Sequence, residues 1–411
     1  MKIKPQTPFQ NLSLAKLFFQ MKKQLVCLIA LAMSVTIWAQ VPRYADVSNL
    51  VLQNNINTHL SDFEGLGVKR RGTPALANAL TWLKGKYTGM GYTSTQFQEQ
   101  SYSYAGATCK NLIVTKTGTL YPNTYVIICG HYDSITGTGT NDNGSGTAIL
   151  LEVARLLRTI PTDYSIKFIH FSGEEDGLMG SQAYVSNVVN NTNPKMNIRL
   201  LFNIDEVGGI AGMTNDTVTC ERDTSNPTTN NAASDAFTQQ LVQYIQWYSP
   251  LQTLLASAYS SDYMSFQSNN EVITGLFETN ETPYRHTAND LLVNMDPVYV
   301  YNIAKGTTGA MLHFAVASIA YLQNPNPEQV LKPTAFMNNQ QLTIYWGNVV
   351  NESVQVSVYD SLGQLVSSYA TLPTELSTNF ELPLLNTGLY VVDIQSNNQH
   401  FAKKVAYMGL R

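Results

Sequence analysis

Apolar runs and segments of helical periodicity alternate along the middle of the chain. The runs at 125–129, 166–171 and 200–204 are rich in β-branched and aromatic residues, which is typical of strands buried on both faces of a sheet. This alternation predicts an α/β fold, in which a mostly parallel mixed sheet is covered by helices. Apolar residues at helical spacing predict the helices at 74–87, capped by Thr73, and at 148–157, 179–189 and 298–322.

The pattern changes to strands and turns after residue 323. Residues 324–327 read Asn-Pro-Asn-Pro, which is typical of a linker. Apolar and polar residues then alternate at 341–345, 354–359 and 389–394, with glycine-containing turns between them, as in strands with one buried face. We expect a small antiparallel all-β sandwich after the linker. The predicted boundaries are 40–323 for the α/β domain, 324–330 for the linker and 331–411 for the sandwich.

The first 39 residues have the pattern of a cleavable signal peptide. Lys22 and Lys23 precede an apolar run at 25–38, which is short for a membrane span and is followed by Ala39. A positive flank, an apolar run and a small residue in this order predict a signal peptide region at 1–39, with Met21 as the true start. We therefore expect an exported protein that keeps no stable membrane span after processing.

Composition and charge narrow the possible partners. Hydrophobic residues make up 44% of the chain and charged residues 13%, which is apolar enough for a sizeable core and excludes a disordered chain. The 25 basic and 29 acidic side chains give a net charge of −4 without any run of Lys or Arg. Nucleic acid is therefore not expected as a partner.

Three cysteines remain beyond the predicted signal peptide, namely Cys109, Cys129 and Cys220. An odd number leaves at least one of them free or paired between chains. Cys109 and Cys129 flank what the pattern predicts as a hairpin of strands 111–116 and 124–129, so a disulfide between them is one possibility in an oxidising compartment. The sequence leaves that pairing open.

Five short polar stretches of the α/β domain lie where strands are expected to end. In open α/β sheets ligands bind beyond the carboxyl ends of the strands, so loops that are distant in sequence converge there. We therefore expect these stretches to form one site. They are residues 130–134, 141–146, 173–177, 203–206 and 284–287.

The side chains of these stretches have the chemistry of a metal site. Imidazoles and carboxylates without a thiolate suit Zn²⁺ or a similar divalent ion, and five ligands exceed what one open catalytic site needs. Two ions bridged by one carboxylate are therefore expected. Adjacent residues at a strand end point in different directions, so one of Glu174 and Glu175 binds metal and the other is free to handle protons. The candidate ligands are His131, Asp142, Glu175, Asp205 and His286.

The motifs together resemble the zinc aminopeptidases of peptidase family M28. In chain order they are His-x-Asp, Asn-Asp-Asn-Gly-Ser-Gly, Gly-Glu-Glu-x-Gly-x-x-Gly-Ser, Asn-x-Asp and a late His-Thr, within about residues 70–321. The resemblance implies a dizinc enzyme that hydrolyses N-terminal residues from peptides through a metal-activated water. It also implies one zinc ion on His131 and Glu175 and the second on Asp205 and His286, or the exchanged partners, with Asp142 bridging both.

The same resemblance implies roles outside the ligand set. Asp133 would orient the first histidine, and Glu174 would be the general base. In the family a Tyr directly precedes the last histidine and polarises the substrate carbonyl, whereas Arg285 stands there in this chain. The group that contacts the substrate carbonyl therefore stays open between Tyr284, Arg285 and Tyr263.

Other polar residues are expected to have structural roles. We expect His59, His170, His313 and His400 to be packed or surface groups, because no acidic motif surrounds them. Four carboxylates either support the ligands, or cap helices or are solvated, namely Asp176, Glu206, Asp262 and Asp290. Glu278 and Glu281 are expected at the surface.

The C-terminal unit resembles the sorting domains of the bacterial type IX secretion system, through residues 354–366, 385–394 and 403–405. This resemblance implies a secreted or cell-surface protein that is exported through the periplasm and recognised by secretion machinery. The alternative is a carbohydrate- or protein-binding sandwich.

Two other functions compete with that of an aminopeptidase. A glutaminyl cyclase is a related single-zinc transferase, but it is expected to lack the stretch present here at 141–146. A non-enzymatic surface-binding protein with a decayed site is expected to have lost at least one ligand, and none is lost.

Overall fold

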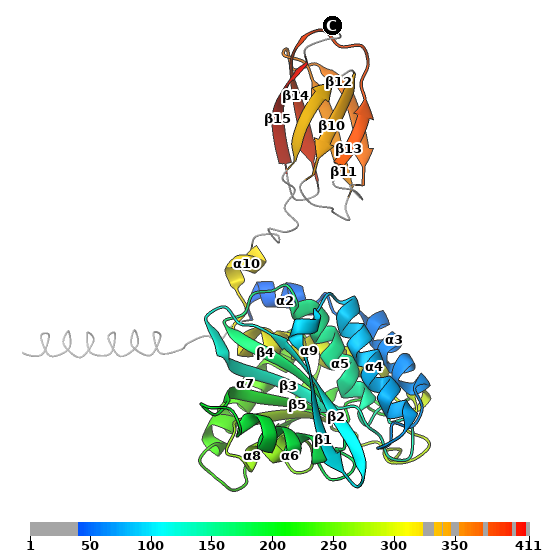
Figure 1. The fold of residues 1–411 in the computed structure, drawn as a ribbon, viewed down its shortest axis with the longest axis vertical. Coiled ribbons are helices and arrows are strands. Elements are labelled where there is room, and N and C mark those ends of the chain that lie inside the picture. The colour runs from blue at the N-terminus through cyan, green and yellow to red at the C-terminus, as the bar shows by residue number, and fades with distance from the viewer. Residues whose placement is uncertain are drawn as a thin grey trace, which may run out of the picture.

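The computed structural model describes residues 40–323, 333–338, 340–346, 353–372, 377–396 and 400–407. The predicted signal peptide at 1–39 and the predicted linker at 324–330 lie outside these residues. The described residues form an α/β unit and a separate all-β unit, as the fold class predicted (Figure 1).

The α/β unit is built on one eight-stranded sheet with the order β1-β2-β4-β3-β5-β8-β6-β7. Its strands are β1 (Phe97–Tyr104), β2 (Ala107–Lys116), β3 (Tyr121–His131), β4 (Tyr164–Phe171), β5 (Asn197–Ile204), β6 (Thr217–Arg222), β7 (Gln252–Ser257) and β8 (Ile273–Glu278). Its helices are α2 (Pro42–Ser48), α3 (Gln53–Gly65), α4 (Pro74–Gly89), α5 (Gly144–Leu157), α6 (Met179–Tyr184), α7 (Asn231–Tyr248), α8 (Tyr263–Gln267), α9 (Pro297–Phe314) and α10 (Ile319–Gln323), with the 3-10 helices η1 (Ser94–Gln96) and η3 (Leu292–Asn294) and the π-helix η2 (Val185–Val189).

The centre of the sheet is parallel. Strands β4, β3, β5 and β8 are neighbours and run in the same direction, while β2 pairs antiparallel with β4 and β6 pairs antiparallel with β8. The carboxyl ends of the four central strands therefore lie at one edge of the sheet. The loops that follow them emerge side by side, which is the condition for one shared site.

Both faces of the sheet are buried because apolar side chains occupy successive positions along each central strand. Val126 and Ile128 of β3 belong to the larger core, together with residues of α3, α4, α5, α7 and α9. Ile127 and Cys129 point to the opposite face and pack with residues of α6, η2 and α8. A strand alternates its side chains between faces, so a continuous apolar run is what a strand between two helical layers requires (Figure 1).

Local signals account for the ends of the helices. The hydroxyl of Thr73 accepts a hydrogen bond from the N–H of Leu76 at 3.3 Å, so Thr73 is the predicted cap of α4. The helix predicted at 298–322 is wrong in its continuity, because α9 ends at Phe314 and α10 begins at Ile319. The intervening backbone leaves the helix to pair with the segment before β4: Tyr164 N–H donates to the Ala315 carbonyl, and Asp163 N–H donates to the Val316 carbonyl.

The predicted hairpin of 111–116 and 124–129 is also wrong. Strand β4 lies between β2 and β3, so these two strands are separated by about 10 Å, twice the spacing of paired strands. Cys109 and Cys129 are both buried free thiols, and so is Cys220. A disulfide requires Cα atoms closer than about 7 Å, which the intervening strand prevents for this pair.

The C-terminal unit is a two-sheet sandwich, as predicted. One sheet has the order β13-β10-β9 and the other β12-β11-β14-β15, with every pairing antiparallel. Its core residues all come from 337–407, and none belongs to the cores of the α/β unit. The strands are β9 (Thr334–Asn338), β10 (Gln341–Tyr345), β11 (Val354–Tyr359), β12 (Leu365–Thr371), β13 (Ser377–Glu381), β14 (Gly388–Gln395) and β15 (His400–Tyr407).

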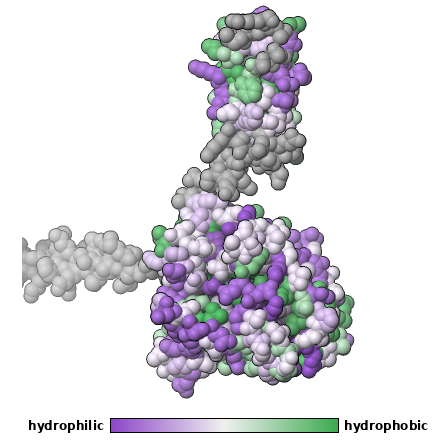
Figure 2. Space-filling view, viewed as in Figure 1, coloured by the Kyte–Doolittle hydropathy of each residue, from purple (hydrophilic) through white to green (hydrophobic). Residues whose placement is uncertain are grey.

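The surface of the α/β unit is mixed in character. In the view of Figure 2, hydrophilic side chains spread across the face and separate smaller hydrophobic patches. No helix among the described residues has the length and apolar character that a membrane crossing requires.

Candidate functional site

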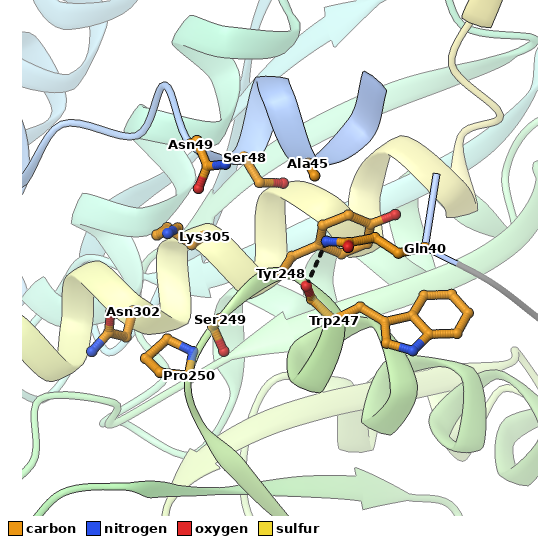
Figure 3. Close-up of a pocket in the computed structure, with 10 residues that line it drawn as sticks. All are labelled: Gln40, Ala45, Ser48, Asn49, Trp247, Tyr248, Ser249, Pro250, Asn302 and Lys305. Carbon is orange, nitrogen blue, oxygen red and sulfur yellow. Dashed lines mark hydrogen bonds between the residues drawn. The ribbon is translucent and has the colours of Figure 1, made fainter. Parts of the chain in front are cut away.

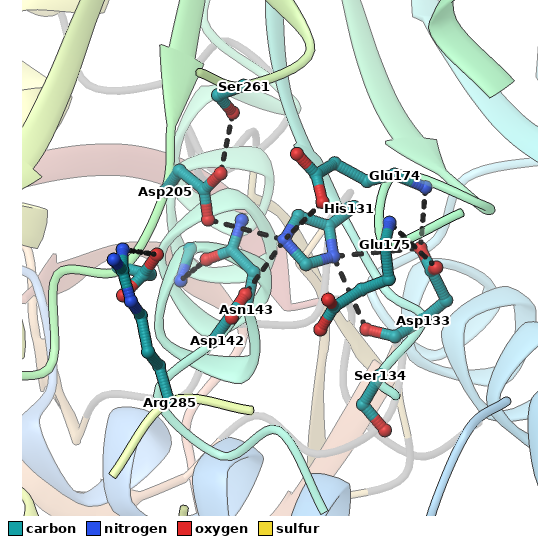
Figure 4. A network of polar contacts seen from close by, with 12 residues as sticks. His131, Asp133, Ser134, Asp142, Asn143, Glu174, Glu175, Asp205, Ser261 and Arg285 are labelled. Atoms are coloured by element: carbon teal, nitrogen blue, oxygen red, sulfur yellow. Dashed lines mark hydrogen bonds and ion pairs between the residues drawn. The ribbon is translucent and has the colours of Figure 1, made fainter. Parts of the chain in front are cut away.

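The five polar stretches meet at the carboxyl edge of the central strands. His131 is the last residue of β3, Glu174 and Glu175 follow β4, and Asp205 follows β5. Asp142 lies between β3 and α5, and His286 follows β8. Figure 4 shows His131 in the middle of this group, with carboxylates directed at both of its ring nitrogens.

Three side chains form the first cluster of possible ligands. His131 Nε2 lies 3.0 Å from Asp142 Oδ1 and 3.3 Å from Asp205 Oδ1. All three side chains are buried, and each offers one atom within 4.8 Å of the others. This cluster has the imidazole and carboxylate composition of a zinc site.

A second cluster shares Asp142 with the first. His286 Nε2 lies 3.2 Å from Asp142 Oδ2 and 2.9 Å from Glu175 Oε2. Asp142 therefore directs one oxygen into each cluster, which is the geometry of a bridging carboxylate. Of the two pairings that the family resemblance implies, His131 with Glu175 is not the one observed: His131 lies with Asp205, and Glu175 with His286.

The position of Asp142 is set by the loop that leads into α5. Asp290 accepts hydrogen bonds from the backbone N–H groups of Asn141 at 2.7 Å and Asp142 at 3.1 Å, which fixes the backbone of the shared carboxylate. The Asn143 side chain caps α5 by accepting from Gly146 N–H at 2.9 Å. A Cβ at Gly146 would lie 2.5 Å from the Ile204 carbonyl oxygen, so the helix can approach β5 this closely only with glycine there.

Asp133 connects the first cluster to the glutamate pair. Its carboxylate accepts from the backbone N–H groups of Glu174 at 3.2 Å and Glu175 at 3.4 Å, and one oxygen lies 3.6 Å from His131 Nδ1. The two glutamates diverge from this anchored backbone. Glu175 faces His286, whereas Glu174 Oε2 lies 4.0 Å from His131 Nε2.

In the site, several carboxylates surround the imidazole side chains of His131 and His286. Burial alone would lower the pKa of His131, but the carboxylates of Asp205 and Glu174 raise it well above its usual range. Burial acts to raise the pKa of Asp142, but the neighbouring imidazoles of His131 and His286 hold it well below the normal value. Burial and the nearby charge of Asp142 raise the pKa of Glu175 to about 8. The two imidazoles thus supply positive charge that the carboxylates require.

The residues present fit divalent metal ions. His131 Nε2 and Asp205 Oδ1 are buried without a hydrogen-bond partner, which is costly unless an ion or donor lies between them. Both atoms belong to the first cluster and point toward each other. A cation bound to these atoms would balance the charge of the surrounding carboxylates.

The three candidates for the substrate carbonyl are placed differently. Arg285 lines the same cleft as Glu174 and the candidate ligands Asp142 and Glu175. Tyr263 does not line this cleft, because it is 2% exposed and its hydroxyl donates to Glu221 at 2.8 Å. Tyr284 is not among the residues that line the cleft either.

The buried contact between Tyr263 and Glu221 predicts a pH effect on stability. Burial raises the pKa of Glu221 to about 8, although the hydrogen bond from Tyr263 acts in the opposite direction. A raised pKa contributes stability below pH 4.5, and this contribution is lost as the pH rises through about 8. As the pH rises from 5 to 9, we expect the unfolding free energy of the Glu221→Gln variant to increase by up to about 4 kcal/mol relative to that of wild type, because only wild type loses this contribution. Urea unfolding of both proteins at fixed zinc concentration measures this difference, and parallel pH profiles would contradict it.

Sequence reasoning missed part of the cleft. Glu206, Tyr259 and Phe277 line it, in a cavity of about 310 Å³. Tyr259 and Phe277 carry no recognisable motif, and only the adjacency of Glu206 to Asp205 pointed to a role. Glu278 was expected at the surface, but it is 1% exposed, because it accepts hydrogen bonds from Asn141 and from the backbone of the loop after β5.

A separate hollow between α2, α7 and α9 has a different character (Figure 3). It measures about 370 Å³ and contains one charged residue, Lys305. None of the predicted site residues lines this hollow.

Both units of the chain match families of known proteins. Residues 111–310 match the family described as peptidase family M28, and residues 338–407 match the secretion system C-terminal sorting domain. Aminopeptidase YwaD of Bacillus subtilis is 38% identical over 108 residues, which cover 26% of this chain and 23% of that protein. Leupeptin-inactivating enzyme 1 of Streptomyces exfoliatus is 34% identical over 163 residues, which cover 38% of this chain and 36% of that protein. The chain thus spans well under half the length of these relatives.

Solved structures share the fold of the α/β unit. The LapA aminopeptidase of Legionella pneumophila aligns with a TM-score of 0.56 and 20% identity, over 66% of this chain and 74% of that chain. The glutaminyl cyclase of Bacteroides thetaiotaomicron aligns with a TM-score of 0.52 and 16% identity, over 63% of this chain and 97% of that chain. At these identities the likeness concerns the fold, which both kinds of enzyme share.

Proposed function

Residues 111–310 of this chain are a peptidase domain of family M28, and from this premise we propose that the protein is a secreted dizinc aminopeptidase that removes N-terminal residues from peptides. The observation that carries the proposal is the position of Asp142. Its two oxygens lie 3.0 Å from His131 and 3.2 Å from His286, so one carboxylate serves two ligand clusters. A carboxylate shared between two ligand clusters suits a two-metal site.

In this proposal His131, Asp142 and Asp205 hold one zinc ion, and Asp142, Glu175 and His286 hold the other. When bound, two zinc ions supply a water acidified toward neutral pH and a positive field for the developing charge. Asp133 keeps the His131 ring in position through its contact with Nδ1.

Glu174 is proposed as the general base. It lies beside the first cluster without belonging to either, and its carboxylate faces the cleft. Burial and the charge of Asp205 raise the pKa of Glu174 well above its usual range, against the effect of His131. A carboxylate with a raised pKa takes a proton from the attacking water and then delivers it to the leaving amine.

The function is tested by metal analysis together with a panel of aminoacyl-nitroanilides carrying free or blocked amines. We expect two zinc ions per chain and hydrolysis of the free-amine substrates only. Cleavage of blocked substrates alone would contradict the aminopeptidase, and one zinc ion with cyclisation of N-terminal glutamine would favour the glutaminyl cyclase. Zinc binding without any turnover would favour the non-enzymatic alternative.

The sorting domain matched at 338–407 suggests a secreted or cell-surface protein. We propose that this domain is recognised by the type IX secretion machinery after transit through the periplasm. The support is the match itself and the separate core of the sandwich.

Removal of the sandwich tests whether the α/β unit is active alone and whether the sandwich is needed for export. We expect a chain truncated after Asn324 to stay folded and active, because the two units have separate hydrophobic cores. In the native host the truncated enzyme should accumulate in the periplasm. Fractionation and activity measurements check both expectations, and export at the wild-type level would contradict the sorting role.

A further inference from the structure

Glu206 is a carboxylate of the cleft that the proposed mechanism does not use. It directly follows Asp205 and is 7% exposed, yet it lines the same cavity as Glu174 and Arg285. Its backbone has φ of 43°, in the left-handed region that a non-glycine residue seldom adopts. The Glu206 carbonyl accepts from Glu278 N–H at 2.9 Å, which helps to hold this conformation.

The two oxygens of Glu206 differ in their surroundings. Oε1 accepts from the Arg285 guanidinium at 3.3 Å, whereas Oε2 is buried without any hydrogen-bond donor among the described residues. A buried carboxylate oxygen without a donor is costly, and a donor group on a bound ligand would satisfy it. Because Glu206 lines the cleft, that partner would come from the bound substrate.

The charges around Glu206 indicate what kind of partner fits. Arg285 also pairs with Glu281 at 2.7 Å, so one guanidinium lies between two carboxylates. Ionised, these three side chains carry a net charge of −1. Arg285 is therefore already neutralised and is poorly suited to bind a substrate carboxylate, while the free oxygen of Glu206 suits a cation that donates hydrogen bonds.

We propose that Glu206 Oε2 binds the α-ammonium group of the substrate and so makes the enzyme require a free N-terminus. The proposal rests on the aminopeptidase function and names the residue that recognises the amine. Two bonds separate an α-amine from the carbonyl carbon of the same residue, so the amine must be held beside the reacting centre. Glu206 suits this role because it lines the same cleft as Asp142, Glu174 and Asp205.

The test compares two inhibitors that differ in the amine alone. Leucine hydroxamate carries the α-amine, and 4-methylpentanoic acid hydroxamate lacks it. In wild type we expect the amine-bearing compound to bind about 10- to 100-fold more tightly, the range of a charge-assisted hydrogen bond. Glu206→Gln should remove this preference by weakening that compound only, with the zinc content unchanged. Calorimetric titration and metal analysis measure both quantities.

Glu281→Gln is the matched control, because it removes the charge of the other carboxylate that pairs with the Arg285 guanidinium. The Glu281 side chain is 48% exposed and Glu281 does not line the cleft, so this variant should keep the wild-type preference for the amine. Equal weakening of both hydroxamates in Glu206→Gln would assign Glu206 to positioning Arg285 and overturn the proposal. An unchanged preference in that variant, or no preference in wild type, would overturn it too. Wild-type cleavage of blocked substrates alone would instead reject the aminopeptidase itself.

Discussion

Glu174→Gln is expected to retain two zinc ions and substrate affinity while kcat falls on the order of 10²–10⁴-fold, the contribution of a general base. The amide keeps the size and hydrogen bonding of the side chain but cannot accept a proton. Glu174 is part of neither ligand cluster, and its Oε2 lies 4.0 Å from His131 Nε2. Steady-state kinetics and zinc stoichiometry on the same preparation check the prediction.

The neighbouring glutamate provides the decisive comparison. Glu175→Gln should lose zinc, because a neutral amide is a poor ligand and Glu175 lies 2.9 Å from His286 in the second cluster. Asp176→Asn is the control in the same loop, since Asp176 pairs with Arg71 and does not line the cleft. It should keep both zinc and activity. A metal-depleted Glu174 variant beside a metal-replete, inactive Glu175 variant would exchange the two roles.

Asp142→Ala is expected to lose more than half of the bound zinc and nearly all activity. The reason is that both clusters lose a ligand at once, whereas loss of Asp205 or Glu175 affects one cluster each. Metal analysis after gel filtration measures the zinc that remains, and near-ultraviolet circular dichroism verifies the fold.

Asp142 is buried, so its replacement by a smaller residue needs a second variant. Asp142→Asn keeps the volume and the backbone contacts to Asp290, and it changes only the charge and the strength of the ligand. We expect the same direction of zinc loss in a folded protein. A folded variant that retains two zinc ions per chain would refute the bridging role.

The sequence by itself determined the class of fold and the parts of the site that short motifs carry. Continuous apolar runs identified β3, β4 and β5, since burial on both faces is a property of neighbouring residues. Motifs after these strands named the candidate ligands, because the carboxyl ends of parallel strands share an edge. The divergence of Glu174 and Glu175 follows from the same local geometry.

Only the tertiary structure decided which groups face one another. Periodicity contains no information on strand order, so the pairing of His131 with Asp205 and the separation of Cys109 from Cys129 became visible only in the sheet. The burial of Glu278 and the entry of Glu206 into the cleft likewise depend on contacts between segments far apart in the chain. Local patterns encode which face of an element is buried, whereas the packing of whole elements sets the distances across a site, and those distances determine its chemistry.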